Sequence, residues 1–267
     1  MSTERPGWAP DDVDLDRPNA ARVYDYLLGG SANFAKDREF AGRLLEIAPD
    51  AAKLARGNRA FLRRAVNYCL RHGIRQFLDI GSGIPTVGNV HEITQRTEPS
   101  ARVVYVDVEP VAVAHTELML AGNENAGVVR GELLEADELL GSEPVRRLLN
   151  LDEPVAVLMV SVLHFLGGNE PYGAVARYVD AMASGSYLVI SHIAAEDSEE
   201  QSQARNLYQK DAVPIVGRTR AELAGFFAGM ELVEPGVVWT PEWHPEASDV
   251  VVEPQLSRGL VAVGRKP

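Results

Sequence analysis

Short apolar segments alternate with segments of helical period from residue 76 almost to the C-terminus. Buried strands are expected at residues 77–80, 102–108, 127–130, 154–163 and 186–191. Helices are expected between or after them, among others at residues 110–121, 172–182, 199–210 and 219–228. Strands that alternate with helices form βαβ units, whose parallel strands are covered by helices on both faces. The pattern therefore predicts an α/β fold with a doubly wound sheet.

The two ends of the chain follow other patterns. No helical pattern separates the last two expected strands, residues 231–238 and 260–263, so the final strand is expected to run antiparallel. Residues 19–72 are helical in period, and residues 1–17 are acidic and carry Pro6, Gly7 and Pro10. We predict a flexible tail over residues 1–17 and a single domain over residues 18–267. Within that domain, residues 18–72 form a helical cap and residues 73–267 the α/β core.

Composition excludes several classes of protein. The 267 residues carry 26 Lys and Arg against 38 Asp and Glu, a net charge of −12, which makes a nucleic-acid partner unlikely. Cys69 is the single cysteine, so neither an intrachain disulfide nor a cysteine-based zinc site is possible. No run of 18 apolar residues and no signal-peptide pattern occurs. We expect a cytoplasmic protein without a membrane partner, and the sequence leaves its oligomeric state open.

A glycine turn follows the first expected strand. In Asp79-x-Gly81-x-Gly83, the glycines let the backbone approach a ligand, and the next helix offers unpaired N–H groups. Asp107 ends the second strand, where a carboxylate can accept both hydroxyls of a ribose. Pro85 removes an N–H from the loop, which weakens a diphosphate site, and Asp79 favours a cationic ligand. S-adenosylmethionine, with its sulfonium and ammonium groups, fits this arrangement.

Two other interpretations of the turn remain open at this stage. Gly81 and Gly83 could simply form a tight turn without a ligand. The site could also belong to an NAD-dependent oxidoreductase, although the dinucleotide fingerprint lacks its third glycine and contains Pro85. P-loop, His-Glu-x-x-His and Gly-x-Ser-x-Gly motifs do not occur, so NTPase, zincin and α/β-hydrolase functions have no support.

The chain resembles class I S-adenosylmethionine-dependent methyltransferases over residues 18–267. It is most similar to a bacterial family of S-adenosyl methyltransferases without an established substrate. The resemblance is carried by ARVYDYLLGG at 21–30, NRAFLRR at 58–64, DIGSGIPT at 79–86, VYVD at 104–107, VLHF at 162–165 and VEPG at 233–236. It implies a Rossmann-like, seven-stranded sheet with an antiparallel last strand. It also implies S-adenosylmethionine as the cofactor and S-adenosylhomocysteine as its product.

The resemblance assigns roles to cofactor-binding residues. Asp79, Gly81 and Gly83 would surround the methionine part, and Asp107 would hold the ribose. Glu132 and Leu133 would flank the adenine, and Ser161 would lie beneath the cofactor. The adjacent Ser82, Val108 and Val162 complete this set, and Tyr26, Asn33 and Phe34 are expected to close over the cofactor as part of a lid. Because Ser161 replaces an acid found in some methyltransferases, a carboxylate base from that strand is doubtful.

Candidates for substrate binding and catalysis lie on three elements. His164 and His192 follow neighbouring strands, so either imidazole could act as a general base, or simply bond to backbone at a strand end. Asn58 and Arg59 in the helical cap are candidate substrate contacts. His91 and His115 lie on other elements, so no metal site is predicted. We expect methyl transfer to a small-molecule acceptor, with a non-catalytic S-adenosylmethionine-binding regulatory or partner-binding protein as the alternative.

Overall fold

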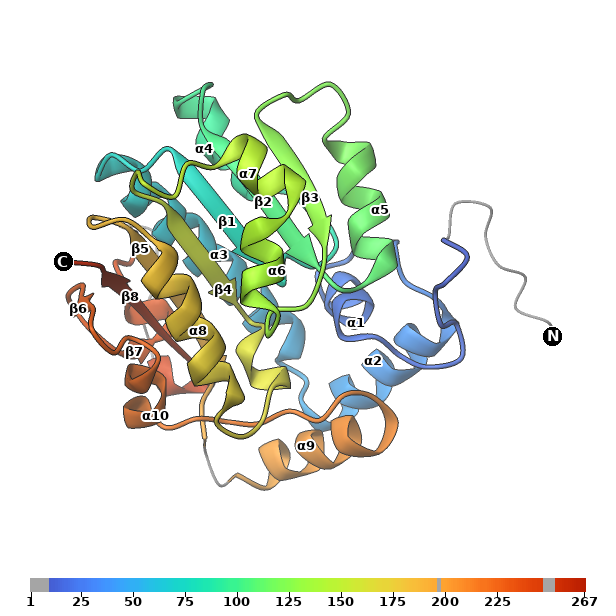
Figure 1. Ribbon diagram of the computed structural model, residues 1–267. Coiled ribbons are helices and arrows are strands. Elements are labelled where there is room, and N and C mark those ends of the chain that lie inside the picture. The colour runs from blue at the N-terminus through green and yellow to red at the C-terminus, as the bar shows by residue number, and fades with distance from the viewer. Residues whose placement is uncertain (1–9, 196–197, 247–252) are drawn as a thin grey trace.

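The centre of the molecule is a twisted sheet of eight strands. We describe residues 10–195, 198–246 and 253–267 of a computed structural model (Figure 1). The strand order is β3-β2-β1-β4-β5-β8-β6, and β7 also pairs with β8. Strands β1 to β5 are parallel, whereas β8 is antiparallel to β5, β6 and β7. The bounds are β1 Gln76–Ile80, β2 Arg102–Asp107, β3 Ala126–Arg130, β4 Ala156–Val160, β5 Tyr187–Ile193, β6 Glu231–Leu232, β7 Val238–Trp239 and β8 Gly259–Arg265.

This topology confirms the doubly wound α/β class and the antiparallel last strand, but the predicted number of seven strands is wrong. The segment expected to be one strand, residues 231–238, contains β6 and the first residue of β7. Between them the chain turns, and the Gly236 N–H donates to the Val233 carbonyl at 2.8 Å. Pro235 has no N–H to continue a strand ladder, and Gly236 has a φ of +81°, which glycine adopts readily.

Helices cover both faces of the sheet. The side chains of α3, α4 and the end of α5 pack with Phe77, Val103 and Leu158 on one face. Helices α6, α7 and α8 pack on the other face with Leu78, Val104 and Met159. The bounds are α1 Ala20–Leu27, α2 Ala35–Ile47, α3 Ala51–Arg71, α4 Val90–Thr97, α5 Pro110–Met119, α6 Ala136–Gly141, α7 Glu143–Leu148, α8 Glu170–Ala181, α9 Glu199–Asp211 and α10 Arg220–Gly225, with short 3₁₀ turns η1 Leu163–Phe165, η2 Thr240–Glu242 and η3 Pro254–Ser257.

Helices α1, α2 and α9 gather at the edge of the sheet where the parallel strands end (Figure 1). Val23, Phe40 and Leu44 form a small core here, against which Leu207 and Tyr208 of α9 pack. Helix α3 leaves this core and then runs across the sheet, where Phe61 and Val66 are fully buried. Residues 1–9 of the predicted tail lie outside the described residues. The predicted division of the chain at residues 17 and 72 stays a prediction.

Candidate active site

A cavity of about 560 Å³ opens at the carboxyl ends of the strands. Asp79 to Gly83 follow or end β1, Asp107 ends β2, Glu132 follows β3 and Ser161 follows β4, and all of them line the cavity. Sheet order reverses between β1 and β4, and ligands of open α/β sheets bind at such a switch point. Helices α1, α2, α3 and α9 supply the opposite walls.

The turn after β1 is built for a close approach of the backbone. Gly81 has a φ of +69°, and a Cβ there would lie 2.4 Å from Cγ2 of Val162. Gly83 has a φ of +68°, but a Cβ there would meet nothing within 4 Å. Position 81 therefore requires glycine for two reasons, the positive φ and the contact that a Cβ would make with Val162. At Gly83 only the positive φ favours glycine, and the space beside its Cα is open.

Asp107 joins this turn to the end of β2. Its Oδ2 accepts a hydrogen bond from the Gly83 N–H at 2.7 Å, and its Oδ1 accepts one from the Glu109 N–H at 2.9 Å. Burial raises the pKa of the Asp107 carboxyl, and the two backbone bonds oppose that shift. An ionised carboxylate has about four acceptor positions, so Asp107 retains capacity for hydroxyl donors from a ligand.

Asp79 is a buried acid with a cation nearby. Burial raises the pKa of Asp79 to about 7, while the Arg59 guanidinium lowers it and the Asp107 carboxylate raises it further. Arg59 itself donates to the Gly88 carbonyl at 2.9 Å and lines the cavity. A ligand ammonium beside Asp79 would stabilise the ionised carboxylate.

A chain of hydrogen bonds crosses from β5 to the helical cap. The Ser161 N–H donates to Ser191 Oγ at 2.9 Å, and the Ser191 hydroxyl donates to Asn58 Oδ1 at 2.6 Å. The Asn58 amide then donates to the Tyr24 hydroxyl at 3.1 Å, which donates to the Ala55 carbonyl at 3.0 Å. All of these residues line the cavity. Asn58 therefore ties α3 to the sheet.

The two histidines lie side by side, with ring centroids 5.8 Å apart. The Arg218 guanidinium lies 2.6 Å from His192 Nε2, and because a guanidinium only donates, Nε2 accepts and carries no hydrogen. His192 Nδ1 then carries the proton and donates to the Ile193 carbonyl at 2.8 Å. Burial lowers the pKa of His192 to about 4, and the Arg218 charge lowers it further.

His164 has a different environment. Its Nδ1 is buried and has no hydrogen-bond partner within the described part of the chain. Burial lowers the pKa of His164 well below its ordinary value, and the nearby His192 and Arg218 lower it further. The imidazole is therefore neutral. Of the two histidines, His164 is the one with a buried ring nitrogen that no described residue engages.

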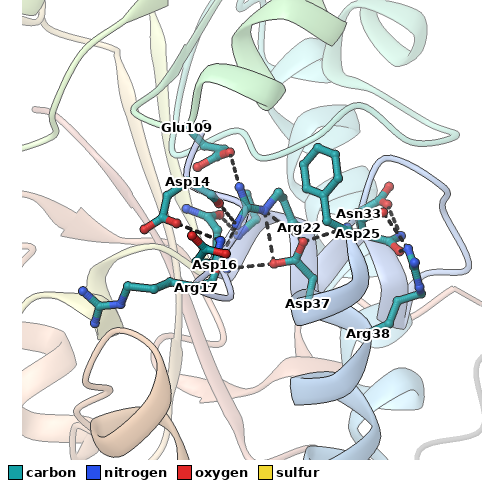
Figure 2. A network of polar contacts seen from close by, with 12 residues as sticks. Asp14, Asp16, Arg17, Arg22, Asp25, Asn33, Asp37, Arg38 and Glu109 are labelled. Carbon is teal, nitrogen blue, oxygen red and sulfur yellow. Dashed lines mark hydrogen bonds and ion pairs between the residues drawn. The ribbon is translucent and has the colours of Figure 1, made fainter. Parts of the chain in front are cut away.

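A buried ionic network links the helical cap to the end of β2 (Figure 2). Arg22 of α1 is 1% exposed, and its Nε lies 3.0 Å from the Asp37 carboxylate. Its Nη1 lies 3.1 Å from Glu109, and its Nη2 donates to the carbonyls of Asp14 and Arg17 at 2.9 and 2.7 Å. Arg22 thus connects the N-terminal segment, α1 and α2 to the residues that follow Asp107.

Most of the sequence-predicted site residues meet in the one cavity, whereas Tyr26, Asn33 and Phe34 do not line it. Asn33 donates to Asp25 Oδ2 at 2.8 Å and to the Gly30 carbonyl at 3.0 Å, which shapes the loop between α1 and α2. Phe34 precedes α2, and its ring lies 5.2 Å from the Arg22 guanidinium. The predicted residues in the cavity are Asn58, Arg59, Asp79, Gly81, Ser82, Gly83, Asp107, Val108, Glu132, Leu133, Ser161, Val162, His164 and His192.

The structure adds residues that the sequence analysis does not single out for the site. Phe165 and Tyr208 line the cavity from η1 and α9, and Arg218 holds η1 through the Leu163 carbonyl at 3.0 Å. The apolar face of α9 could have drawn attention to Tyr208, whereas no local pattern marks Arg218. The described residues contain no group of three or more His, Cys, Asp or Glu side chains that could hold a metal ion. Nor does that part of the chain contain a helix suited to spanning a membrane.

The cavity fits S-adenosylmethionine by its own chemistry. The Ser82 hydroxyl is buried at the glycine turn without a hydrogen-bond partner among the described residues. Asp79 offers a carboxylate for an ammonium, and Asp107 offers one for ribose hydroxyls. With the strand order above, these features define a class I, Rossmann-like S-adenosylmethionine-dependent methyltransferase.

Comparison with known proteins agrees. The family model described as S-adenosyl methyltransferase matches residues 6–267, so the chain belongs to the S-adenosyl methyltransferase family. A candidate methyltransferase from Thermobifida fusca is 36% identical, with a TM-score of 0.92 over 98% of this chain and 99% of that one. A DUF574 family protein from Streptomyces avermitilis is 36% identical, with a TM-score of 0.91 over 95% and 99% of the two chains.

More distant structures share the fold. Human N-acetylserotonin methyltransferase in complex with S-adenosylmethionine is 13% identical, with a TM-score of 0.51 over 93% of this chain and 63% of that one. No curated protein matches the sequence. The family match does not favour a purely regulatory protein or an NAD-dependent oxidoreductase.

Proposed function

We propose that the protein is an active enzyme that methylates a small-molecule acceptor within the cavity at the strand ends. The observation that carries this proposal is the continuity of that cavity. The carboxylates suited to the cofactor, the neutral His164 and an apolar region all line the same space. S-adenosylmethionine supplies an activated methyl group, so the protein has mainly to position the acceptor and exclude water.

Each cofactor-binding residue has a proposed task. Asp107 accepts hydrogen bonds from the ribose hydroxyls, while Gly83 and Glu109 hold its carboxylate in place. Asp79 binds the ammonium of the methionine part. Ser82 offers a hydroxyl without a partner in the described structure. Glu132 and Leu133, which follow β3, flank the adenine.

The helical cap and the histidines have proposed tasks at the acceptor. Asn58 and Arg59 bound the space between cofactor and acceptor, and Asn58 is fixed by Ser191 and Tyr24. His164 is the proposed proton acceptor, because its neutral imidazole lines the cavity beside the apolar region. His192 has a proposed structural role. Its neutral imidazole links Arg218 to the Ile193 carbonyl, so both of its ring nitrogens are already bonded.

Calorimetric titration of the full chain with S-adenosylmethionine, S-adenosylhomocysteine and NAD tests the cofactor assignment. We expect the first two to bind and NAD to give no heat of binding. Transfer of a labelled methyl group to compounds of a metabolite extract then tests catalysis. Cofactor binding without any methylated product would contradict the enzyme assignment and favour the regulatory alternative.

A further inference from the structure

The two ends of the cavity differ in chemistry. Every acidic side chain that lines it among the described residues lies at the end of β1, β2 or β3, or in the segments that follow them. The other end is bounded by α2, η1, α9 and residues 213–215. Its apolar lining side chains there are Leu44, Ala48, Phe165, Ala204, Tyr208, Val213 and Ile215, and Gln201 and Arg205 of α9 also line it. We call this end the apolar chamber.

Two aromatic rings form walls of the apolar chamber. The ring centroids of Phe165 and Tyr208 lie 6.5 Å apart at an interplanar angle of 49°. Phe165 comes from η1, which Arg218 fixes, and Tyr208 comes from α9, where it also packs edge-on against Phe40 at 4.9 Å. Burial raises the pKa of Tyr208 to about 12, so its side chain is neutral. Such walls favour a planar aromatic ligand through edge and face contacts.

The charges near the apolar chamber disfavour a cation. Arg205 and Arg258 line the cavity near α9 and η3. Arg258 pairs with Glu200 through both terminal nitrogens, and Arg205 donates to Ser202 Oγ at 3.1 Å. Among the described residues, no carboxylate lines the chamber itself. A cationic ligand would lose its hydration there without a compensating charge.

The cavity has the size of a small-molecule site. Its volume of about 560 Å³ is well within the usual range of small-molecule sites, roughly 300–1,000 Å³. The polar end is the proposed cofactor site, and the apolar chamber belongs to the same cavity, where the rings of Phe165 and His164 lie 4.3 Å apart. The chamber is therefore placed to hold a second molecule beside the cofactor.

We propose that the apolar chamber binds an uncharged aromatic molecule, which is the methyl acceptor. This proposal rests on the proposed function, because it assigns the acceptor class of the same site. The chamber excludes cationic amines by its lack of a carboxylate, and the rings of Phe165 and Tyr208 offer edge and face contacts to a planar ligand.

Three probes of matched shape test the proposal: 2-naphthol, 2-naphthoate and 2-naphthylmethylammonium. Their binding to the full chain saturated with S-adenosylhomocysteine is measured by calorimetry. We expect 2-naphthol to bind at least about tenfold more tightly than either charged probe. Equal affinities, or tighter binding of the ammonium or the carboxylate probe, would overturn the proposal.

Two variants of α9 locate the probe. Ala204 lines the chamber, whereas Asn206 is exposed on the same helix. Ala204→Trp fills the chamber and should weaken 2-naphthol binding at least about tenfold, while Asn206→Trp leaves it unchanged. Both variants should bind S-adenosylhomocysteine like the parent. Unchanged 2-naphthol binding by a folded Ala204→Trp variant would overturn the chamber assignment.

The outcomes separate this proposal from the proposed function. If S-adenosylhomocysteine does not bind the parent chain, the proposed function fails. If it binds and the three naphthyl probes do not discriminate, only the acceptor class fails.

Discussion

The guanidinium of Arg22 lies 3.1 Å from the carboxylate of Glu109, and both side chains are almost fully buried. Glu109 stands two residues after Asp107 and donates its own N–H to the Asp107 carboxylate. The helical cap is thus bonded to the segment that holds the candidate ribose-binding acid. The ion pair between Arg22 of α1 and Glu109, which lies between β2 and α5, therefore connects the helical cap to the α/β core.

Replacement of Arg22 should destabilise the fold strongly. Arg22→Met leaves Asp37 and Glu109 buried without their cation, which costs about 3–5 kcal/mol in the free energy of unfolding. Urea denaturation measures the loss. Lys36→Met, which removes an exposed pair with Glu39, is the control and should cost at most about 1 kcal/mol. Similar small losses in both variants would show that the buried network contributes little.

Asp107→Asn should weaken cofactor binding. The asparagine side chain keeps one acceptor oxygen, so it can still accept the hydrogen bond from the Gly83 N–H in the glycine turn. A charge-assisted hydrogen bond is worth about 1.5–3 kcal/mol, so affinity should fall about tenfold to a hundredfold. S-adenosylmethionine and S-adenosylhomocysteine should lose similar factors, as titration calorimetry can measure. The exposed Asp152→Asn is the matched control. Parent-like affinity in Asp107→Asn would remove this acid from the site.

Asp79 should make cofactor affinity depend on pH. Its pKa in the free protein is about 7, and only the ionised carboxylate attracts the ligand ammonium. The affinity for S-adenosylhomocysteine should therefore fall by about tenfold for each pH unit below 7. Adenosine, which lacks the ammonium, should bind with little pH dependence, and Asp79→Asn should remove the difference. The measurement is a set of titrations from pH 5 to pH 8, and parallel curves for both ligands would contradict the assignment.

The same carboxyl should affect stability in the opposite direction. Burial raises the pKa of Asp79 from its ordinary 3.8 to about 7, so its protonated form is favoured in the folded state. Its contribution to stability is complete below about pH 4 and is lost as the pH rises through 7. Without ligand, Asp79→Asn should be more stable than the parent at pH 8, by as much as about 4 kcal/mol. Urea midpoints at pH 5 and pH 8 test this, and a variant less stable than the parent at pH 8 would refute it.

His192 should remain neutral across the physiological range. Its pKa of about 4 and its Nδ1–H tautomer follow from burial and from the donor Arg218. Nitrogen NMR shifts of a His192 resonance assigned by substitution should stay constant from pH 8 to pH 5. A titration midpoint near 6.5 would mean that Arg218 does not occupy Nε2 in solution.

Sequence patterns predict the sheet and the residues that line the cavity at the strand ends, because both depend on local signals. The strand–turn–helix at Gly81 and the strand ending in Asp107 are each contained in a short segment. Local patterns do not predict that residues 231–238 divide between two strands. Apolar, strand-like residues such as Val233 and Val238 lie on both sides of Gly236, so the segment resembles one strand. Helices α6 and α7 are six residues each, too short for a clear period.

The apolar end of the site depends on contacts that no local pattern contains. Phe165 and Tyr208 are 43 positions apart in the sequence, and they meet only in the tertiary structure. Likewise, Arg218 reaches back to Leu163 over 55 positions. Their roles become visible only when the tertiary contacts are known.

The two ends of the cavity are built by different elements of the fold, so the acceptor preference can change while the cofactor site stays the same. The proposed cofactor end depends on strand termini that also hold the core together, whereas the chamber depends largely on α2, α9 and a 3₁₀ turn at the periphery. Grafting α9 and residues 212–216 from one homologue onto another should thus exchange acceptor preference while leaving the methyl-donor affinity of the recipient intact.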